Sequence, residues 1–132
     1  MIDLGLSPAG TMMEALDMEA LEATPERVRI KMPVGPKVRQ PYGLLHGGAS
    51  VALAETAASI ATALNIDRET QWAVGLEINA NHVRSVRDGS VIAEATPLHR
   101  GKSSMVWDIK IRNDAGELVC ISRCTVAVTA KR

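Results

Sequence analysis

The longest helix-like segment of this chain contains a single ionisable side chain. Between Gly47 and Ile66 only Glu55 is charged, and the other residues are mostly small or aliphatic. Their spacing predicts a long helix from about His46 to Leu64. An exposed helix normally carries charged residues on its outer face, and this one does not. We therefore expect it to be covered on both sides, by its own sheet on one and by a partner or ligand on the other.

Glu55 is expected on the less bulky side of this helix. At 100° per residue, the larger side chains fall on one ridge and the smaller ones on the opposite side. A carboxylate in a largely apolar contact surface costs several kcal/mol unless it is paired or functional. Glu55 therefore either reaches solvent along the one wet stripe of the helix or serves as a desolvated general base or nucleophile. The ridge is Leu53, Ala57, Ile60 and Leu64, and the opposite side is Val51, Glu55, Ala58, Ser59 and Thr62.

Most of the remaining chain has the period-two pattern of strands. Apolar and charged residues alternate from Arg27 to Val34, and again where Trp107, Ile109 and Ile111 alternate with Asp, Lys and Arg. A third alternating segment places its apolar residues on one face. Three turn segments separate consecutive strands, which we expect to be antiparallel through Val128. The apolar residues of that third segment are Val74, Leu76, Ile78 and Ala80, and the turns lie at residues 87–89, 99–102 and 113–116.

The order of these elements defines a fold class. A short helix is expected from Pro8 to Asp17, with Thr11 as its N-cap and Glu14 as the capping-box partner. The chain then runs through a strand, the long helix and four strands in a row. This order predicts an α+β fold in which a curled antiparallel sheet wraps around one long central helix. A length of 132 residues fits one domain spanning 1–132.

Charge balance and composition exclude several kinds of partner. The 15 basic and 15 acidic residues cancel, and aromatic residues make up 2% of the chain, so no nucleic-acid partner is expected. No segment has the composition of a membrane span or a secretory signal, which predicts a cytoplasmic protein with no membrane partner. The histidines and cysteines lack the spacing of metal ligands, so neither a metal nor a cofactor is expected. These residues are His46, His82, His99, Cys120 and Cys124.

The start of the long helix has the composition of an oxyanion-binding site. Gly47 and Gly48 follow His46 at the first turn, where backbone N–H groups have no partner within the helix. Such preorganised donors stabilise the oxyanion formed when a carbonyl is attacked. The two glycines are equally consistent with close packing alone, because HGG is a short motif.

The distance between this oxyanion-binding site, which we call the oxyanion cradle, and Glu55 implies a second chain. Nine residues separate His46 from Glu55, which is about 13 Å of helical rise. Two groups so far apart cannot act on one carbonyl at contact distance. If both take part in one reaction, the cradle of one subunit must face Glu55 of another, as in a two-fold homodimer.

The segment Gln40 to Ser50, with Leu53-Ala54-Glu55 after it, resembles the active-site signature of hotdog-fold acyl-CoA thioesterases. Residues 74–84 and 97–101 resemble the same family, and the likeness runs from about Gly10 to Val128. Glutamate at position 55 is similar to the 4-hydroxybenzoyl-CoA thioesterase branch, and to the 1,4-dihydroxy-2-naphthoyl-CoA hydrolases of menaquinone synthesis in particular. A related enzyme with similar motifs proofreads misacylated aryl carrier protein, and the sequence does not separate the two activities.

The resemblance implies a role for each residue of the motif. Glu55 would be the nucleophile or general base, and the Gly47 N–H the oxyanion donor. His46 and Gln40 would bind the thioester and orient water. Ser59 would help to hold the water or the acyl ring, although a serine inside a helix as commonly bonds back to a carbonyl.

The resemblance also implies an acyl-CoA substrate and an assembly of at least two chains. Phosphates are bound by Arg, Lys and exposed backbone in turns, and the candidates for the CoA phosphates are His82, Arg84, Arg100, Lys102 and Ser103. The family favours a tetramer formed as a dimer of dimers. An aryl pocket in this chain would be lined by aliphatic residues and Met, because Tyr42 is the only aromatic residue near the motif.

Three other functions compete with a thioesterase. A hydratase or dehydratase on the same fold would use a catalytic His beside an acid, a setting that none of the three histidines has. An acyl-CoA sensor would bind without turnover. A purely structural protein would use the small helix face only as a dimer seam, and Glu55→Gln would then leave any activity untouched.

Overall fold

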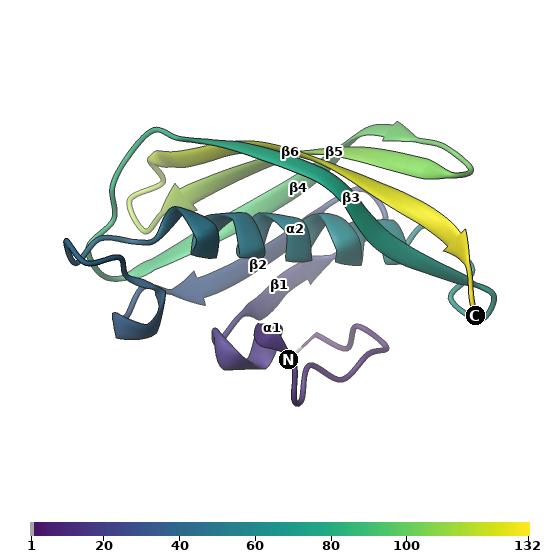
Figure 1. The fold of residues 1–132 in the computed structure, drawn as a ribbon, viewed down its shortest axis with the longest axis horizontal. Helices are drawn as coiled ribbons and strands as arrows, with labels where there is room; N and C mark the ends of the chain where they lie inside the picture. The colour runs from purple at the N-terminus through teal and green to yellow at the C-terminus, as the bar shows by residue number, and fades with distance from the viewer. Residues whose placement is uncertain (1) are drawn as a thin grey trace.

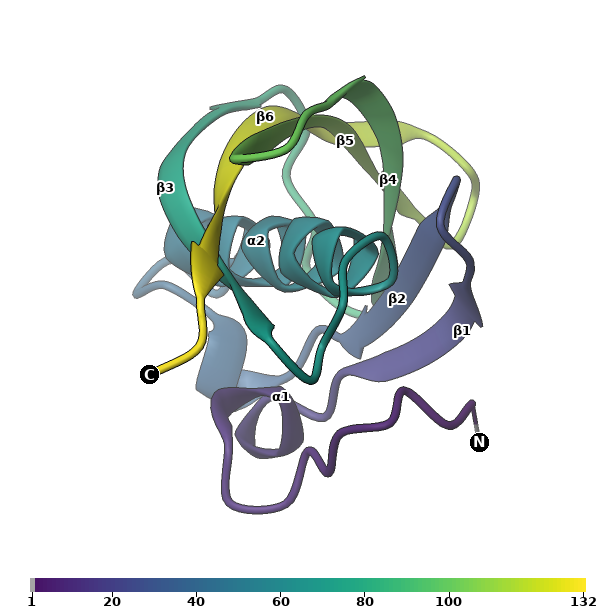
Figure 2. The ribbon, with the colours of Figure 1, turned by 90° about the vertical axis from the view of Figure 1, so that its right-hand side faces the viewer.

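The computed structural model describes residues 2–132, which form one curled antiparallel sheet around a long helix (Figures 1 and 2). The order of the six strands is β1-β2-β4-β5-β6-β3. This arrangement confirms the α+β hotdog prediction. The helical elements are α1 (Met12–Ala15), η1 (Pro36–Val38) and α2 (Gly47–Ala63), and the strands are β1 (Glu19–Ala23), β2 (Val28–Pro33), β3 (Gln71–His82), β4 (Ser90–Arg100), β5 (Ser104–Asn113) and β6 (Leu118–Ala130).

The inner face of the sheet and one side of α2 form the core. The alternation in β2 is confirmed, because Val28, Ile30 and Met32 are fully buried and the intervening residues are not. The same holds in β5 for its three large apolar residues, of which Trp107 is the largest fully buried side chain. Strand periodicity therefore identified the inward residues of both strands correctly.

The prediction that the last four strands follow one another in the sheet was wrong for β3. This strand pairs with β6, with Ile78 opposite Cys124, while β4 pairs with β2 and β5. Residues 83–89 therefore connect the edge strand β3 to the interior strand β4 instead of forming a tight turn, as Figure 1 shows. Strand β1 was not predicted, because its Glu, Ala and Leu residues favour helix over strand.

A bulge in β3 changes which of its residues point toward the core, so the apolar residues before it and after it lie on different faces of the strand. The register shifts between Gly75 and Glu77, so one extra residue lies in β3. Ile78 and Ala80 pack against the core, whereas Val74 and Leu76 point outward and are 48% and 66% exposed. The expectation that these four apolar residues share one face was therefore wrong.

The N-terminal helix is shorter than predicted. It spans Met12–Ala15 instead of Pro8 to Asp17, with Leu16 as its C-cap, and Asp17 follows the cap with a φ of +56°. Thr11 is its N-cap but makes no side-chain cap hydrogen bond, because its hydroxyl donates to the carbonyl of Pro8. Glu14 accepts from the N–H of Gly10 at 3.2 Å, so the predicted capping box is absent.

Helix α2 begins and ends close to the predicted residues, with His46 as N-cap and Leu64 as C-cap. Its buried side is wider than expected, because a curled sheet covers more of a helix than a flat one (Figure 2). Ala58 and Thr62 lie in the core and not on the open side with Glu55. The Thr62 hydroxyl accepts a hydrogen bond of 2.9 Å from the indole N–H of Trp107. None of the helices within residues 2–132 combines the length and the apolarity that a membrane crossing requires.

Candidate active site

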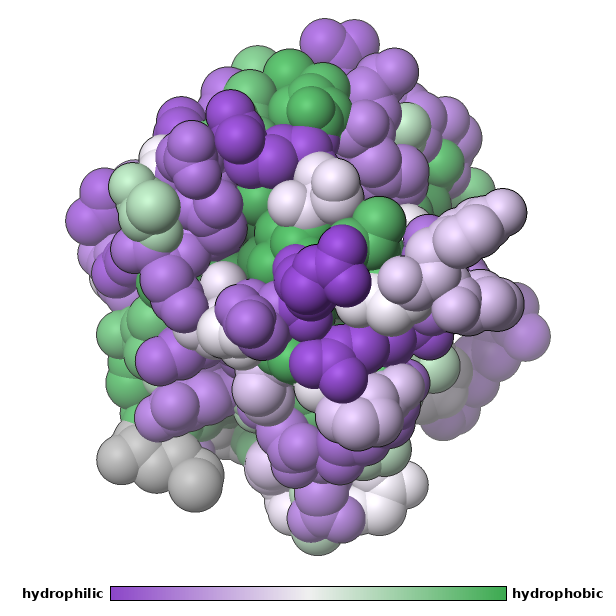
Figure 3. Space-filling view, turned by 90° about the vertical axis from the view of Figure 1, so that its left-hand side faces the viewer, coloured by the Kyte–Doolittle hydropathy of each residue, from purple (hydrophilic) through white to green (hydrophobic). Residues whose placement is uncertain are grey.

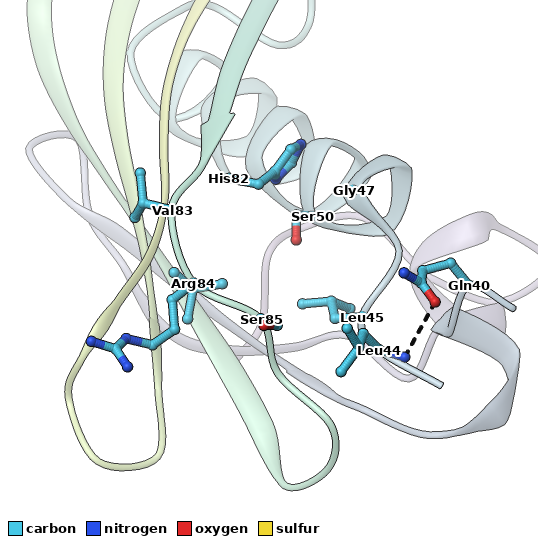
Figure 4. A pocket seen from close by; sticks show the side chains of 10 residues that line it. Gln40, Leu44, Leu45, Gly47, Ser50, His82, Val83, Arg84 and Ser85 are labelled. Carbon is cyan, nitrogen blue, oxygen red and sulfur yellow. Dashed lines mark hydrogen bonds between the residues drawn. The ribbon is translucent and has the colours of Figure 1, made fainter. Parts of the chain in front are cut away.

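The first turn of α2 faces an open hollow of about 640 Å³ at one end of the molecule, which we call the Gly47 hollow. Gln40, Leu45, Gly47, Ser50, His82 and Arg84 are among its lining residues (Figure 4). Figure 3 looks onto this end, where hydrophilic side chains surround a central apolar surface. The fold therefore places the segment before α2 next to the end of β3, as Figure 4 shows.

Gly47 lies directly against His82. A Cβ at position 47 would be 2.8 Å from His82 Nε2, a distance at which the imidazole would have to move. The Gly47 N–H makes no hydrogen bond to the rest of residues 2–132, as expected for the first residue of a helix. Gly47 thus combines the two roles left open by the sequence, a free backbone donor and a close approach of a second side chain.

His46 caps the helix that it precedes. Its Nδ1 accepts a hydrogen bond of 2.8 Å from the N–H of Gly48. An accepting Nδ1 assigns the proton of the neutral imidazole to Nε2, so the exposed edge of His46 is a hydrogen-bond donor. Gly48 is packed against the same ring, since a Cβ there would lie 2.9 Å from His46 Nδ1.

Gln40 is held by the turn that follows it. Its Oε1 accepts from the backbone N–H of Tyr42, and from that of Leu44 at 3.4 Å. Gly43 supports this turn with a φ of +84°, a conformation that glycine adopts at little cost. With its oxygen occupied, Gln40 presents a free NH2 group at the Gly47 hollow (Figure 4).

Glu55 lies in a second hollow of about 560 Å³, which we call the Glu55 hollow. The open side of α2 and the N-terminal segment form it, including Leu4, Leu6, Met12 and Met13. The carboxylate faces the backbone of Gly75, where a Cβ would overlap it. Within residues 2–132 the Glu55 side chain makes no hydrogen bond or ion pair, so no partner neutralises it.

Ser59 lines the Glu55 hollow one turn after Glu55. Thr56 and Thr62 both donate to the carbonyl four residues earlier, at 2.7 and 2.8 Å. No such bond forms from Ser59, so the alternative that this serine bonds back to the helix is not what the structure shows. Its hydroxyl is available to a ligand.

The charge of Glu55 affects the pKa of a buried thiol on β6. Burial, together with the carboxylates of Glu55 and Glu77, raises the pKa of Cys124 to about 12. Burial also raises the pKa of Cys120. Both thiols are fully buried and are protonated at neutral pH, so neither acts as a nucleophile.

One chain does not bring all the predicted catalytic residues together. Gln40 and Gly47 line one hollow, and Glu55 and Ser59 line the other. Gly47 and Glu55 are both within α2, and the helical rise between them is about 12 Å. The separation expected from the sequence is therefore present in the fold.

The five candidates for the CoA phosphates fall at two ends of the sheet. His82 and Arg84 line the Gly47 hollow, where Arg84 lies 3.4 Å from Glu117. Arg100 and Lys102 line a shallow hollow beside Gln71 at the start of β3. The turn that carries them and Ser103 lies at the end of the molecule opposite His82 (Figure 1). A single chain therefore forms no cluster of all five.

Two residues next to the predicted site residues contribute to the candidate site without having been predicted to do so. Gly75 lies between the apolar residues of β3 in the sequence and makes room for Glu55. Ser50 was included in the motif without a role, although it lines the Gly47 hollow. The signal for Ser50 is its position three residues after Gly47, which places both on one face of a helix.

Known proteins are similar to this chain in both sequence and fold. The model of the family described as "Thioesterase superfamily" matches residues 42–120. A 1,4-dihydroxy-2-naphthoyl-CoA hydrolase of Listeria monocytogenes is 46% identical over 121 residues, which are 92% of this chain and 98% of the relative. The crystal structure of a mutant thioesterase from Pseudomonas aeruginosa superimposes with a TM-score of 0.93 at 41% identity, and covers 97% of this chain and 92% of its own.

A Staphylococcus aureus thioesterase adds a comparison of residue spacing. Its structure has a TM-score of 0.90 at 48% identity, and covers 91% of this chain and 99% of its own. Two of its crystal structures carry alanine in place of a glutamate and in place of a glutamine. Those two positions are 15 residues apart, as are Gln40 and Glu55 in this chain. Fold, motif and family model agree, and the chain belongs to the thioesterase superfamily as a thioester hydrolase of the hotdog fold.

Proposed function

We propose that this protein hydrolyses aromatic acyl-CoA thioesters of the 1,4-dihydroxy-2-naphthoyl or hydroxybenzoyl type to the free acid and CoA. The observation that supports it most is the pair of complementary groups described above, the free donors of Gly47 and Gln40 and the unpaired carboxylate of Glu55. The substrate named for the Listeria relative supplies the acyl class. In that compound a hydroxyl occupies ring carbon 1, next to ring carbon 2, which bears the thioester carbonyl.

In the proposed reaction the thioester carbonyl oxygen accepts hydrogen bonds from the Gly47 N–H and the Gln40 NH2 group. These donors polarise the carbonyl and stabilise the oxyanion that forms on attack. The partner subunit's Glu55 either removes a proton from the attacking water or attacks the carbonyl carbon itself. Collapse of the tetrahedral intermediate expels CoA as a thiolate, which takes up a proton. If Glu55 is the nucleophile, water then hydrolyses the resulting anhydride.

The free edge of β3 supports the dimer that this reaction requires. β3 is 12 residues long and ends the strand order, so one of its edges has no neighbour within residues 2–132. The apolar residues Trp72, Val74 and Leu76 are exposed on this strand. Long exposed apolar edges are normally covered in native proteins. A second copy of β3, paired antiparallel about a two-fold axis, would cover this edge and run the two α2 helices in opposite directions.

The same pairing would bring the CoA candidates together. An antiparallel β3 pair puts the end of one copy, at His82, beside the start of the other, at Gln71. Gln71 shares its hollow with Arg100 and Lys102. We therefore propose that these two residues approach the Gly47 hollow from the partner subunit. A dimer of such dimers remains an expectation of the family resemblance.

A thioester panel tests the proposed function. CoA release is measured for wild type and Glu55→Gln with an aryl-CoA, an aliphatic acyl-CoA and an aryl carrier protein substrate. We expect aryl-CoA to be hydrolysed fastest and the isosteric variant to lose a hundredfold or more, as expected for loss of a base or nucleophile. Fastest turnover of the aryl carrier protein would instead assign the proofreading activity. No turnover, or a variant as active as wild type, would contradict the assignment to Glu55.

A further inference from the structure

Ser50 is a buried residue whose hydroxyl makes no hydrogen bond within its own chain. The residue is 1% exposed, yet its hydroxyl makes no hydrogen bond within residues 2–132. Thr56 and Thr62 of the same helix do bond to the carbonyl four residues before them. Figure 4 shows the Ser50 hydroxyl pointing into the Gly47 hollow, which it lines. The hydroxyl oxygen itself keeps access to the hollow, because no fully buried side-chain oxygen or nitrogen of residues 2–132 lacks a hydrogen-bond partner. A ligand that fills the hollow would close this access, and a hydroxyl left there without a partner costs about 1–3 kcal/mol. We therefore expect the hydroxyl to bind a polar group of such a ligand.

The helix places this hydroxyl beside the expected position of the reacting carbonyl. Residues three apart on a helix are neighbours at about 5–6 Å, and side chains lean back toward the helix N-terminus. The Ser50 side chain therefore lies toward Gly47, whose N–H binds the thioester oxygen in the proposed function. A group that reaches Ser50 must be attached close to that oxygen.

The surroundings of Ser50 favour a ring as the carrier of this group. Leu44, Leu45, Val83 and Val119 supply aliphatic surface to the same hollow. A hydroxyl on the ring carbon next to the one bearing the carbonyl lies at hydrogen-bond distance from the carbonyl oxygen, about 2.7 Å. A serine hydroxyl both donates and accepts, so it can pair with such a phenol whichever way the phenol proton points.

We propose that Ser50 is a specificity-determining residue that hydrogen-bonds the ortho-hydroxyl of an aromatic acyl group, an inference that rests on the proposed function. Ser50 would discriminate substrates by the position of their hydroxyl, not by the presence of a ring. A ring without an ortho-hydroxyl would leave the buried Ser50 hydroxyl unpaired in the complex. Sites built to bind a substrate hydroxyl reject analogues that lack it for this reason.

The test compares three thioesters that differ only in the ring hydroxyl: 2-hydroxybenzoyl-CoA, 4-hydroxybenzoyl-CoA and benzoyl-CoA. For Ser50→Ala we expect kcat/KM to fall about tenfold with the 2-hydroxy substrate. The values for the other two are expected to equal or exceed those of wild type, because the variant no longer leaves a hydroxyl unpaired in their complexes. Ser50→Thr keeps the hydroxyl and is expected to retain the preference. Removal of a hydroxyl with no partner should leave thermal unfolding unchanged, which separates this role from a structural one.

Each other outcome contradicts a defined part of the argument. An equal loss on all three substrates would show that Ser50 acts on the reaction centre and not on the ring hydroxyl, and would overturn the proposal. Unchanged kinetics of Ser50→Ala on an active wild type would overturn it as well. If wild type hydrolyses none of the three thioesters, the proposed function is wrong and the role of Ser50 falls with it.

Discussion

The imidazole of His82 lies against the backbone of Gly47, with Nε2 only 2.8 Å from the point that a Cβ at residue 47 would occupy. The last residue of β3 and the first residue of α2 thus form one wall of the Gly47 hollow. Any side chain at position 47 must displace the imidazole. The glycine is required here by contact with another part of the chain, and not by a positive φ.

Gly47→Ala is predicted to lower activity without lowering stability. The added methyl moves His82 away from the hollow while the backbone donor at residue 47 remains. Displacement of a substrate-binding group by about 1 Å costs up to about a hundredfold in rate, whereas alanine is the better helix former. kcat/KM for an aryl-CoA and the urea unfolding midpoint check both parts.

Gly35→Ala is the matched control, because Gly35 has an ordinary φ and open space around its missing Cβ. It is expected to match wild type in both measurements. Full activity of Gly47→Ala would show that His82 is not needed in its present position.

Mixing two variants of low activity is predicted to raise the activity if the site spans two chains. Glu55→Gln damages one half of each site and Gly47→Ala the other. After the two are unfolded together and refolded at equal amounts, half of the dimers are mixed and each mixed dimer holds one intact site of two. Activity should rise to about a quarter of wild type. A mixture no more active than its components would contradict the shared site.

Thr62→Val is predicted to destabilise the core. The variant keeps the shape of the side chain but removes the oxygen that accepts from Trp107 at 2.9 Å. An indole N–H left without an acceptor in a fully buried position costs about 1–3 kcal/mol of unfolding free energy. Urea titration followed by tryptophan fluorescence measures it, with Thr129→Val, at an exposed position, as the control. Equal midpoints for the two variants would show that the Thr62 hydrogen bond contributes nothing.

Both thiols are predicted to be unreactive in the native protein. Cys120 and Cys124 are fully buried, and burial is the main cause that raises the pKa of Cys124 to about 12 from an ordinary 9.0. A thiol reagent of the kind that detects released CoA should therefore label two cysteine thiols per chain in denaturant and none in the folded protein. Rapid labelling of the folded protein at neutral pH would contradict the burial of this strand.

The raised pKa of Cys124 also makes the free energy of unfolding depend on pH. A group whose pKa is higher in the folded than in the unfolded chain stabilises the fold fully below its unfolded value. The contribution of Cys124 is therefore complete below about pH 9 and is lost as the pH rises toward 12. Urea titrations between about pH 9 and 12 should therefore show a smaller fall in the free energy of unfolding for Cys124→Ala than for wild type.

The course of the long helix, the alternation of β2 and β5, and the motif from Gln40 to Glu55 were all readable from the amino-acid order. These features depend on residues close to one another in the chain. Helical and strand periods, caps and a contiguous motif are local properties, so the sequence carries them directly. The separation of Gly47 from Glu55 was readable for the same reason, since both belong to one helix of known rise.

Pairing between distant segments was not readable in this way. β4 pairs with β2 and β5, which leaves β3 at the edge beside β6, and a bulge after Gly75 then turns two apolar residues outward. Each strand can pair with any of several strands that are distant in the chain. Which pairs form depends on these long-range contacts, and a local sequence pattern does not specify them.

The contacts that complete the candidate site result from this long-range strand pairing. His82 against Gly47, Gly75 beside Glu55 and the burial of Ser50 all follow from where β3 and the curled sheet meet α2. The amino-acid order alone predicted the groups that we propose carry the chemistry. Their neighbours, and therefore their freedom to bind a ligand, were settled by the packing of the sheet around the helix, because burial and approach depend on residues that only folding brings together.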